Sequence, residues 1–252
     1  MPAGLATIAN PLRWQLLSEL ARSDRRVNEL MCLLGQPQNL VSYHLRELRE
    51  AGLVSARRSS FDGRDSYYRM HGERLAEVLC AAATSLDSGL RLKAAPPEVG
   101  TLSSQPRRVL FLCTGNSSRS QMAEALLEHL SAHSIDAHSA GSHPRPLAPM
   151  AIGVMVTRGI DTSANSSKHL GEFIGSNFDQ VVTLCDKVRE VCPEFPGSPE
   201  PIHWSIPDPS SITGTEEERY AAFESVAADL EVRITHLIAQ LAVPEGETTN
   251  VR

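Results

Sequence analysis

Long hydrophobic runs are missing from this 252-residue sequence. No stretch reaches the roughly 18 consecutive apolar residues of a membrane-spanning helix, so we expect no membrane span and no membrane partner. The N-terminal residues also lack a basic region followed by an apolar one and a cleavage site, so we expect no secretory signal peptide. These two absences lead us to expect a cytoplasmic location.

Cysteine is scarce and its count is odd: the five residues are at positions 32, 80, 113, 185 and 192. In a cytoplasmic chain, such cysteines are more often reactive or buried thiols than parts of a disulfide framework. Internal repeats are absent, and 41% apolar with 21% charged residues is an ordinary globular composition. We therefore expect packed cores rather than a disulfide-bonded scaffold.

Charge and composition divide the chain in two. Residues 1–93 carry 13 Lys and Arg against 10 Asp and Glu, a net charge of +3, whereas residues 94–252 carry 11 against 20, a net charge of −9. Only the first part suits a polyanion. Three prolines, two glycines and three serines between Ser88 and Pro106 indicate a linker. We expect an N-terminal domain at 1–88, a linker at 89–106, a second domain at 107–243 and a flexible tail at 244–252.

The N-terminal domain begins with three predicted helices. Asn10-Pro11 precedes leucines at helical spacing, which indicates a capped first helix. The Gln36-Pro37 turn ends a short second helix. A third helix buries Val41, Leu45 and Leu48, which recur at i, i+4 and i+7. Its opposite face is polar and carries Gln38, Asn39, Ser42, Tyr43, Arg46 and Arg49.

A hairpin follows the third helix. The runs Leu53–Arg58 and Ser66–Met70 have strand character, and Asp62-Gly63 between them is a turn signal. Helix, turn, polar-faced helix and basic hairpin in this order predict a winged helix-turn-helix, mainly α-helical with a β-hairpin wing. The segment Ser42–Val54 resembles the ArsR/SmtB regulator family, and the likeness covers about residues 5–87.

That resemblance implies a homodimer that binds operator DNA. In the family the polar helix enters the major groove, the wing contacts the DNA backbone, and terminal helices form the dimer. Each feature alone has a plainer explanation, since polar helix faces and basic hairpins are usually only solvated. The order of the elements is what favours DNA binding. The residues that we expect to contact DNA are Gln38, Asn39, Ser42, Tyr43, Arg46, Arg57, Arg58 and Arg64.

One departure from the family concerns arsenic sensing. Arsenic-sensing members carry two cysteines flanking one residue in a Glu-Leu-Cys-Val-Cys type of helix, whereas this chain has Glu29-Leu-Met-Cys-Leu-Leu34. Both expected thiolate positions are apolar, and Cys32 alone does not chelate As(III) strongly. The plain alternative is that Cys32 and Cys80 are buried core residues. We likewise expect His44 to pack or cap rather than to bind metal, and the sequence does not identify the inducer.

A strand, a loop of small residues and a helix open the second domain. Arg108–Leu112 contains a continuous apolar run, typical of a strand covered on both faces. It leads into Cys113-Thr-Gly-Asn-Ser-Ser-Arg119-Ser120 and then into apolar residues at helical spacing. This arrangement aims backbone N–H groups and a helix N-terminus at an oxyanion. The oxyanion-binding residues that we expect are Thr114, Gly115, Asn116, Ser117, Ser118, Arg119 and Ser120.

Cys113 opens this loop and is the predicted nucleophile. The loop dipoles and the Arg119 guanidinium both stabilise a thiolate, and Ser120 can donate a hydrogen bond to it. The guanidinium also offers a planar fork for two oxygens of a tetrahedral anion. Gly115 and Asn116 suit left-handed backbone positions. The alternative is a structural cysteine in a turn that binds no phosphate.

The pattern Cys-x5-Arg-Ser between a buried strand and a helix resembles the low-molecular-weight protein tyrosine phosphatase fold over most of the second domain. The resemblance implies an α/β domain with a four-stranded parallel sheet. Two further strand-like runs, which start at Gln180 and Ile202, lead to Cys185 and Asp208. Because ligands bind outside the carboxyl ends of parallel strands, we expect Cys113, Cys185 and Asp208 to face one crevice.

Cys185 and Cys192 stand seven residues apart. On a helix that separation is two turns, or about 10 Å by rise alone, whereas a disulfide needs Cα atoms within about 7 Å. An intact helix between them would forbid the bond, so an exchange between the two thiols requires the segment to unwind. Pro193, Pro196 and Gly197 leave the segment poorly held on its downstream side. The alternative is two unrelated buried thiols.

Three blocks of sequence resemble thioredoxin-coupled arsenate reductases. They are Cys113–Glu124, Val181–Pro193 and His203–Pro209, in that order. The resemblance implies that the Cys113 thiolate attacks arsenate and that Cys185 then attacks Cys113, which releases arsenite. Cys192 takes over the disulfide from Cys185, and thioredoxin reduces it. The family further implies that Asp208 is the general acid and that the enzyme needs neither a metal nor a cofactor.

Two departures from the reductases concern the loop. A reductase loop of this kind has a second cysteine where this chain has Ser118, outside the relay, so activity should survive. Some relatives bind potassium through residues that match Asn116, Glu124, Ser139 and an aspartate, and the aspartate position here is Lys168. We therefore expect the Lys168 ammonium to occupy the cation site.

The sequence thus predicts a bifunctional arsenic-resistance protein, a transcriptional regulator fused to an arsenate reductase. The second interpretation is a tyrosine phosphatase fused to a regulator, which needs the Cys113 loop and Asp208 but neither Cys185 nor Cys192. Ser210-Ser211 argues against it, since the phosphatases usually place aromatic residues there. The third is a regulator whose reductase-like domain only senses oxyanion or redox state. The operator, the coupling of the domains and the choice between thioredoxin and a mycothiol-type reductant stay open.

Overall fold

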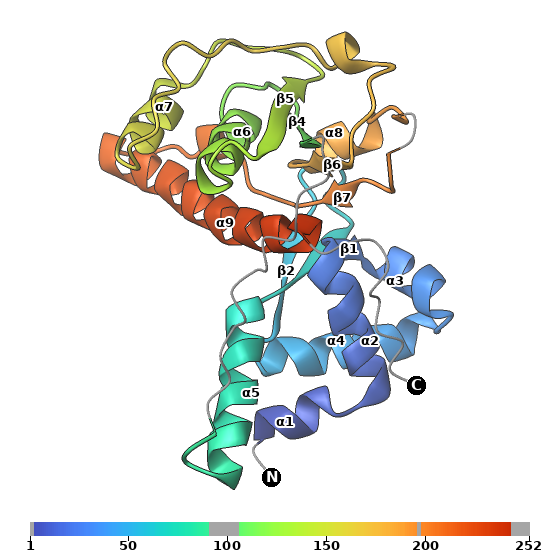
Figure 1. Ribbon diagram of the computed structural model, residues 1–252. Coiled ribbons are helices and arrows are strands. Elements are labelled where there is room, and N and C mark those ends of the chain that lie inside the picture. The colour runs from blue at the N-terminus through green and yellow to red at the C-terminus, as the bar shows by residue number, and fades with distance from the viewer. Residues whose placement is uncertain (1–2, 91–105, 196–197, 243–252) are drawn as a thin grey trace. The chain divides into compact units, whose positions relative to one another are not determined.

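The computed structural model describes residues 3–90, 106–195 and 198–242. The chain forms two compact units, Met1–Ala94 and Ala95–Arg252 (Figure 1). Within the described ranges, no helix has both the length and the apolar character that crossing a membrane requires. Most of the expected linker, the expected tail, Pro196 and Gly197 lie outside these ranges.

The N-terminal unit combines five helices with a small antiparallel sheet in its described part. The sheet has the strand order β1-β3-β2. The predicted helix-turn-helix and its hairpin are therefore confirmed. The elements are α1 (Ala3–Ile8), α2 (Pro11–Arg22), β1 (Arg25–Arg26), α3 (Val27–Leu34), α4 (Gln38–Glu50), β2 (Val54–Arg58), β3 (Ser66–Met70) and α5 (Gly72–Leu86).

Local sequence accounts for where these helices begin and end. The Asn10 side chain accepts a hydrogen bond from the Arg13 N–H at 3.1 Å and so caps α2. Gly35 closes α3 in the left-handed region with φ of 62°, and Gly52 follows α4 with φ of 70°. The sequence does not predict strand β1. This strand consists of Arg25 and Arg26, and two arginines show no alternation of apolar and polar residues.

The core of the N-terminal unit lies among α2, α3 and α4, where Leu16, Leu30 and Leu45 are fully buried. His44 is buried as expected, and burial lowers its pKa, with the charge of Arg13 adding to the effect. The alternative of buried core cysteines is wrong: Cys32 and Cys80 are both exposed, because each points away from the face by which its helix packs. They do not contribute to the core.

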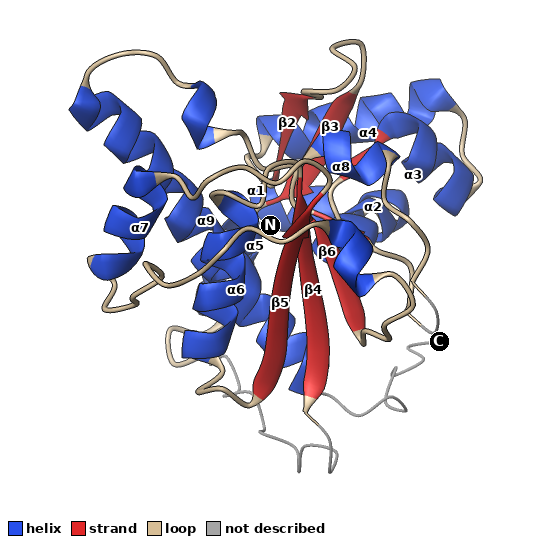
Figure 2. Ribbon diagram, turned by 90° about the horizontal axis from the view of Figure 1, so that it is seen from above, coloured by secondary structure: helices blue, strands red, loops and turns tan. Residues whose placement is uncertain are grey.

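The C-terminal unit has a parallel four-stranded sheet with the order β5-β4-β6-β7 (Figure 2). The predicted α/β fold with a four-stranded parallel sheet is confirmed. Its strands are β4 (Arg107–Cys113), β5 (Ile135–Gly141), β6 (Gln180–Thr183) and β7 (Ile202–His203). Its helices are α6 (Arg119–Leu130), α7 (Pro149–Val156), α8 (Asp186–Glu190) and α9 (Glu216–Ala242), with short 3-10 turns η1 (Leu170–Phe173) and η2 (Pro209–Ser211).

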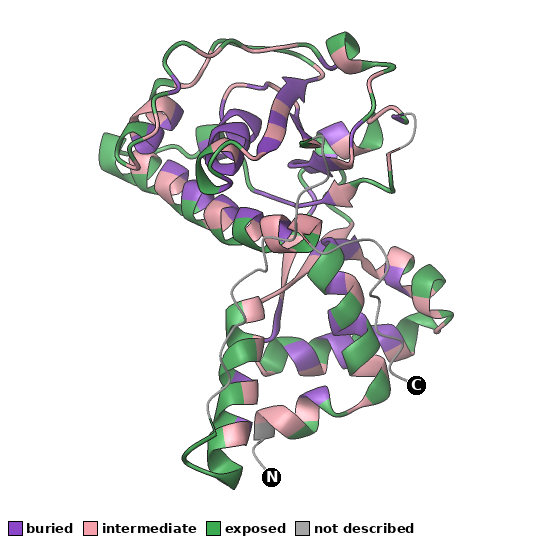
Figure 3. Ribbon diagram, in the orientation of Figure 1, coloured by how far each residue is buried: buried purple, intermediate pink, exposed green. Residues whose placement is uncertain are grey.

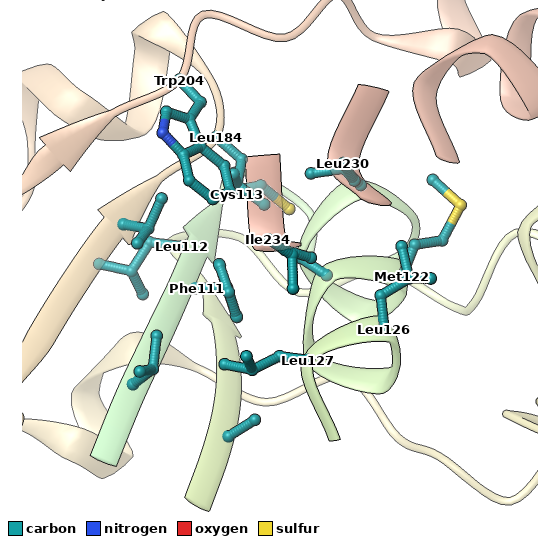
Figure 4. Packing of buried hydrophobic residues seen from close by; sticks show 14 of the residues in the cluster. Phe111, Leu112, Cys113, Met122, Leu126, Leu127, Leu184, Trp204, Leu230 and Ile234 are labelled. Atoms are coloured by element: carbon teal, nitrogen blue, oxygen red, sulfur yellow. The ribbon is translucent and has the colours of Figure 1, made fainter. Parts of the chain in front are cut away.

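Strand β4 lies in the middle of this core. Residues 109–112 are fully buried, because α6 packs on β4 and β5 while α8 packs against β4 and β6. Helix α9 packs against α6 and α7. Figure 3 shows the resulting difference between α6, which is buried along most of its length, and α9, which presents a green outer face. Figure 4 shows Cys113 at the end of β4 near Leu184, so the hydrophobic core extends to the Cys113 side chain.

Candidate functional site

The loop between β4 and α6 wraps around the Cys113 sulfur. Cys113 is the last residue of β4 and is buried. Its Sγ accepts a hydrogen bond from the Asn116 N–H at 3.2 Å and lies 3.0 Å from Ser120 Oγ. The Asn116 N–H thus points at the sulfur, and the Ser120 hydroxyl lies within hydrogen-bond distance of it. This is the geometry expected of a nucleophile.

Only one of the two predicted left-handed positions in the loop is left-handed. Asn116 has φ of 44°, whereas Gly115 is absent from the positive-φ residues of the described chain. Glycine suits position 115 for another reason, because a Cβ there would meet Ser117 Oγ at 3.1 Å. The predicted left-handed backbone at Gly115 is therefore wrong. Glycine suits this position because a side chain there would crowd Ser117.

Arg119 begins α6 and turns its guanidinium toward the mouth of the loop. Its Nη1 donates to the Ile206 carbonyl at 3.0 Å, and its Nη2 lies 3.1 Å from Asp208 Oδ2. The buried Nε has no hydrogen-bond partner among the described residues. A buried N–H without an acceptor is costly. An oxyanion seated in the loop would supply that acceptor.

Asn116 also ties the loop to the rest of the unit. Its Nδ2 donates to Ser120 Oγ at 2.9 Å and to Ser139 Oγ at 2.8 Å. Its Oδ1 accepts from the Lys168 N–H at 2.7 Å and from Gln121 Nε2 at 3.1 Å. All four bonds hold the one strained residue of the loop, so the cradle is formed before any anion binds.

The Lys168 ammonium lies beside this network. Nζ donates to Glu124 Oε1 at 3.0 Å and to Oε2 at 3.2 Å. Ser139 donates to the same carboxylate, and Glu124 is mostly buried. A positive charge therefore stands where Asn116, Glu124 and Ser139 converge.

Cys185 lies next to the loop, although it is far away in sequence. The Leu184 N–H donates to the Leu112 carbonyl at 2.7 Å, which brings the residues after β6 level with the end of β4. Cys185 is buried, and its Sγ lies 3.2 Å from Thr114 Oγ1. The structure thus brings Cys113, Cys185 and Asp208 to the same ends of the strands.

Cys192 lies outside α8, so no intact helix runs from Cys185 to Cys192. Cys185 is the N-cap of this helix, which ends at Glu190. Pro193 follows Cys192 directly and cannot continue a helix hydrogen-bond pattern. Burial raises the pKa of the Cys192 thiol to about 11. The thiol lines a cavity of about 470 Å³ that extends to Thr183 of β6.

The remaining residues expected at the oxyanion site lie in the same loop. The Ser117 carbonyl accepts from the Ala148 N–H at 2.8 Å, which fixes the loop from outside. Ser118 is buried and is the N-cap of α6. The N-terminus of α6 therefore follows the loop directly, which is the arrangement that an oxyanion site requires.

The residues expected to contact DNA lie on two surfaces of the N-terminal unit. The wing carries Arg57, which is half-buried, and Arg58 and Arg64, which are exposed. The α4 residues are all exposed, and Arg46 lies over the Tyr43 ring at 5.5 Å. The exposed α4 residues are Gln38, Asn39, Ser42, Tyr43 and Arg46.

One group of polar residues near Cys185 is not indicated by the sequence. Asp186, His203 and Ser205 are all buried, and His203 and Ser205 both bond to Asp186. Asp186 and His203 fall in the matched blocks, but nothing in those patterns shows that they meet. No cluster of three or more His, Cys, Asp or Glu suited to a metal ion occurs in the described parts of the chain.

Sequence profiles of known families match both halves of the chain. Residues 108–245, more than half of the chain, match the sequence profile described as low molecular weight phosphotyrosine protein phosphatase. The chain belongs to this family. Residues 10–56 match the profile described as bacterial regulatory protein, arsR family. The N-terminal unit is therefore an arsR-type helix-turn-helix domain.

Individual relatives of this phosphatase-family member have a common name. An arsenate reductase of Halalkalibacterium halodurans is 39% identical over 126 residues, which are 50% of this chain and 91% of that protein. An arsenate reductase of Bacillus subtilis gives the same figures. One from Staphylococcus aureus strain Newman is 36% identical over 113 residues, 45% of this chain and 86% of that protein.

Among solved structures, the chain is similar to an arsenate reductase in the phosphate binding state, with 30% identity and a TM-score of 0.48. The likeness covers 54% of this chain and 98% of that one. The two family profiles and the sequence relatives show that the chain joins an arsR-type regulator domain to an arsenate reductase-like domain of the phosphatase family.

Proposed function

We propose that the chain is an arsenate reductase fused to a DNA-binding regulator and that it works in the cytoplasm with thioredoxin as reductant. The observation that carries the reductase assignment is the 3.2 Å contact between Cys185 Sγ and Thr114 Oγ1, next to Cys113. A phosphatase needs no second thiol there. A reductase needs one within reach of the first.

The loop supplies the arsenate site. Backbone N–H groups of the loop, the α6 N-terminus and the Arg119 guanidinium all favour a tetrahedral oxyanion. The unpartnered Nε of Arg119 supports this role, because it is a buried donor with room for an acceptor. The loop residues from Thr114 to Ser120 would surround the anion.

The reaction begins at Cys113. Its thiolate forms a bond to As(V), the bond from arsenic to one arsenate hydroxyl group breaks, and that hydroxyl leaves as water after it takes a proton from Asp208. The Cys185 thiolate then attacks Cys113 Sγ. The S–As bond breaks, its electron pair stays on arsenic, and arsenite leaves. Two thiols have been oxidised to the Cys113–Cys185 disulfide, and As(V) has been reduced to As(III).

The disulfide then moves outward. The Cys192 thiolate attacks Cys185 Sγ, and Cys113 leaves as a thiolate, ready for the next arsenate. Cys192 is half-buried whereas Cys185 is buried, so the new disulfide is reached from the Cys192 side. Thioredoxin attacks Cys192 there, and Cys185 leaves as a thiolate. The short α8 must open for the second exchange.

For the N-terminal unit we propose operator binding as a homodimer. The exposed polar face of α4 would enter the major groove, and Arg58 and Arg64 of the wing would contact phosphates. Support comes from the arsR-family profile over residues 10–56. The fusion would then place an arsenic-resistance enzyme and its regulator in one chain.

A second candidate function is protein tyrosine phosphatase activity, which the family profile favours. It would use the Cys113 loop, Arg119 and Asp208 alone. The polar Ser210 and Ser211 after Asp208 speak against it, because an aromatic phosphate ester gains little from two serine side chains at the mouth of the site.

Steady-state arsenate reduction with thioredoxin, thioredoxin reductase and NADPH tests the proposal. We expect turnover in the wild type and none in Cys113→Ser, Cys185→Ser or Cys192→Ser. Exposed Cys32 provides the matched control, and Cys32→Ser should keep full turnover. Absence of arsenate turnover together with aryl-phosphate hydrolysis that survives Cys185→Ser would establish the phosphatase instead.

A further inference from the structure

A buried carboxylate follows Cys185 directly. Asp186 is fully buried at the first turn of α8. His203 Nε2 lies 3.1 Å from Asp186 Oδ1, and Ser205 Oγ donates to the same oxygen at 2.7 Å. Thr183 Oγ1 lies 2.9 Å from the other ring nitrogen of His203, Nδ1. Because a buried carboxylate is costly without partners, these bonds keep Asp186 in place.

The hydrogen-bond partners of Asp186 lie at the end of β7 and just after it. His203 ends β7, and β7 pairs with β6 so that Thr183 and His203 are opposite each other. The Trp204 N–H then donates to the Thr183 carbonyl at 2.9 Å. The three residues Asp186, His203 and Ser205 thus connect the start of α8 to the sheet, and we call them the clamp.

Cys185 is held on both sides as a result. On one side, the Leu184 N–H donates to the carbonyl of Leu112 at 2.7 Å, and Leu112 directly precedes Cys113. On the other side stands Asp186 in the clamp. A residue between two fixed neighbours has little freedom, so Cys185 Sγ stays near Thr114.

The far end of the segment is held differently. Helix α8 ends at Glu190, and Val191 is 57% exposed. Cys192 packs against the edge of the hydrophobic core, and its Sγ makes a polar contact, at 3.6 Å, only with the carbonyl of its neighbour Pro193 among the described residues. The cavity of about 470 Å³ beside Cys192 gives this end space to move.

We propose that Asp186, His203 and Ser205 act as positioning residues that hold Cys185 beside Cys113, so that only the Cys192 end of the segment moves during the relay. The role in arsenate reduction rests on the proposed function. The geometric claim is independent of it: the clamp makes the bond between Cys113 and Cys185 form quickly. Loss of the clamp should slow that step and leave Cys113 itself unchanged.

The test uses the full chain with Cys192→Ser, which stops the relay after the first disulfide. Hydrogen peroxide replaces arsenate as the oxidant. It converts the Cys113 thiolate to a sulfenic acid and releases hydroxide; the Cys185 thiolate then attacks Cys113 Sγ and displaces a second hydroxide. The Cys113–Cys185 disulfide is followed by peptide mass spectrometry, and alkylation of Cys113 by iodoacetamide is measured in parallel.

Three clamp variants and a control are compared. We expect Asp186→Ala and Ser205→Ala to slow disulfide formation at least tenfold while Cys113 alkylation stays within twofold. Asp186→Asn keeps an oxygen acceptor and should recover most of the rate. The control is Asp136→Ala, which breaks a partly exposed His–Asp pair on the edge strand β5, His138 Nε2 with Asp136 Oδ2 at 3.0 Å. It should leave both rates unchanged.

Unchanged disulfide formation in Ser205→Ala and Asp186→Ala would overturn the proposal. So would an equal loss of both rates in the mild Ser205→Ala variant, because a general loss of structure affects Cys113 too. The assay contains no arsenate. A chain that fails to reduce arsenate but shows clamp-dependent disulfide formation would therefore contradict the proposed function and support the clamp.

Discussion

Arg119 Nη2 lies 3.1 Å from Asp208 Oδ2, so the cation of the oxyanion site and the proposed general acid are paired to each other in the free enzyme. An incoming anion shares Arg119 with this carboxylate. The side chain of Asp208 is 47% exposed, so water screens part of the attraction. Binding and catalysis therefore make opposite demands on one residue.

Replacing Asp208 should separate those demands. In Asp208→Asn the anion no longer meets a competing negative charge, so we expect phosphate to bind severalfold more tightly. Arsenate turnover should fall by about a hundredfold, a typical contribution of general acid catalysis. Calorimetric titration with phosphate and steady-state kinetics measure the two effects. Asp161→Asn, at an exposed loop aspartate, is the control, and weaker phosphate binding in Asp208→Asn would contradict the pairing.

The Cys192 thiol should react slowly at neutral pH. Burial raises its pKa to about 11 from an ordinary value of 9.0. At pH 8 its thiolate fraction, and with it alkylation by iodoacetamide, should be about a hundredfold lower than for an ordinary thiol. The exposed Cys32 in the same sample is the internal control. Equal rates at both residues would refute the burial argument.

The same thiol gives stability a pH dependence. The folded state keeps the Cys192 proton up to about pH 11, whereas the unfolded chain releases it near 9.0. Between these values the unfolded state binds fewer protons, so the free energy of unfolding falls as the pH rises. In Cys192→Ser that part of the fall should disappear, as denaturant titrations at several pH values would reveal.

Potassium should have no effect on the wild type, because the Lys168 ammonium already pairs with both oxygens of Glu124. In Lys168→Ala the largely buried Glu124 carboxylate loses its charged partner, so we expect the free energy of unfolding to fall by about 1–3 kcal/mol. Added potassium should restore part of it. Melting temperatures with and without potassium measure this, and Lys187→Ala is the control. A potassium-dependent rise in the wild type would disprove it.

The wing arginines should contribute charge rather than sequence recognition. Arg58→Ala or Arg64→Ala should weaken binding to all DNA sequences alike and lower the slope of log K against log salt by about 0.9 for each lost phosphate contact. Ser42→Ala on α4 should instead alter which sequences are preferred. Fluorescence anisotropy at several salt concentrations distinguishes the two. Arg74→Ala on α5, paired with Glu77 at 2.7 Å, should change neither.

The two units should lose stability independently. Leu45 is fully buried in the N-terminal core, so Leu45→Ala should cost that unit about 2–5 kcal/mol. DNA binding should weaken while arsenate turnover stays unchanged at low temperature. Leu112→Ala in β4 should have the reverse effect. Differential scanning calorimetry would show which transition each substitution moves, and a single transition shifted by both would contradict independence.

The sequence predicts the parts of this molecule in which local pattern and local structure coincide. The apolar run of β4, the small-residue loop and the start of α6 are adjacent in the chain, so Cys113 and Arg119 could be placed together in advance. Helix α4 was predicted for the same reason, from its buried leucines. The relation of Cys185 to Cys113 needed only the rule that parallel strands end on one side.

Features that depend on partners distant in the chain could not be predicted from the sequence. The bond between Asp186 and His203 follows from the register of β6 and β7, and no local pattern sets that register. The exposure of Cys32 depends on which face of α3 packs inward, and one cysteine among apolar neighbours does not reveal it.

The brevity of α8 has a consequence for how such an enzyme evolves. Five residues hardly exceed the costly nucleus of a helix, so the segment gains little from its own hydrogen bonds and opens at a small fraction of the free energy that unfolds the whole unit. Substitutions that favour helix there would raise the melting temperature and slow the transfer of the disulfide. Under the proposed relay, selection for heat resistance and selection for fast disulfide transfer would therefore act against each other at Asp186–Glu190.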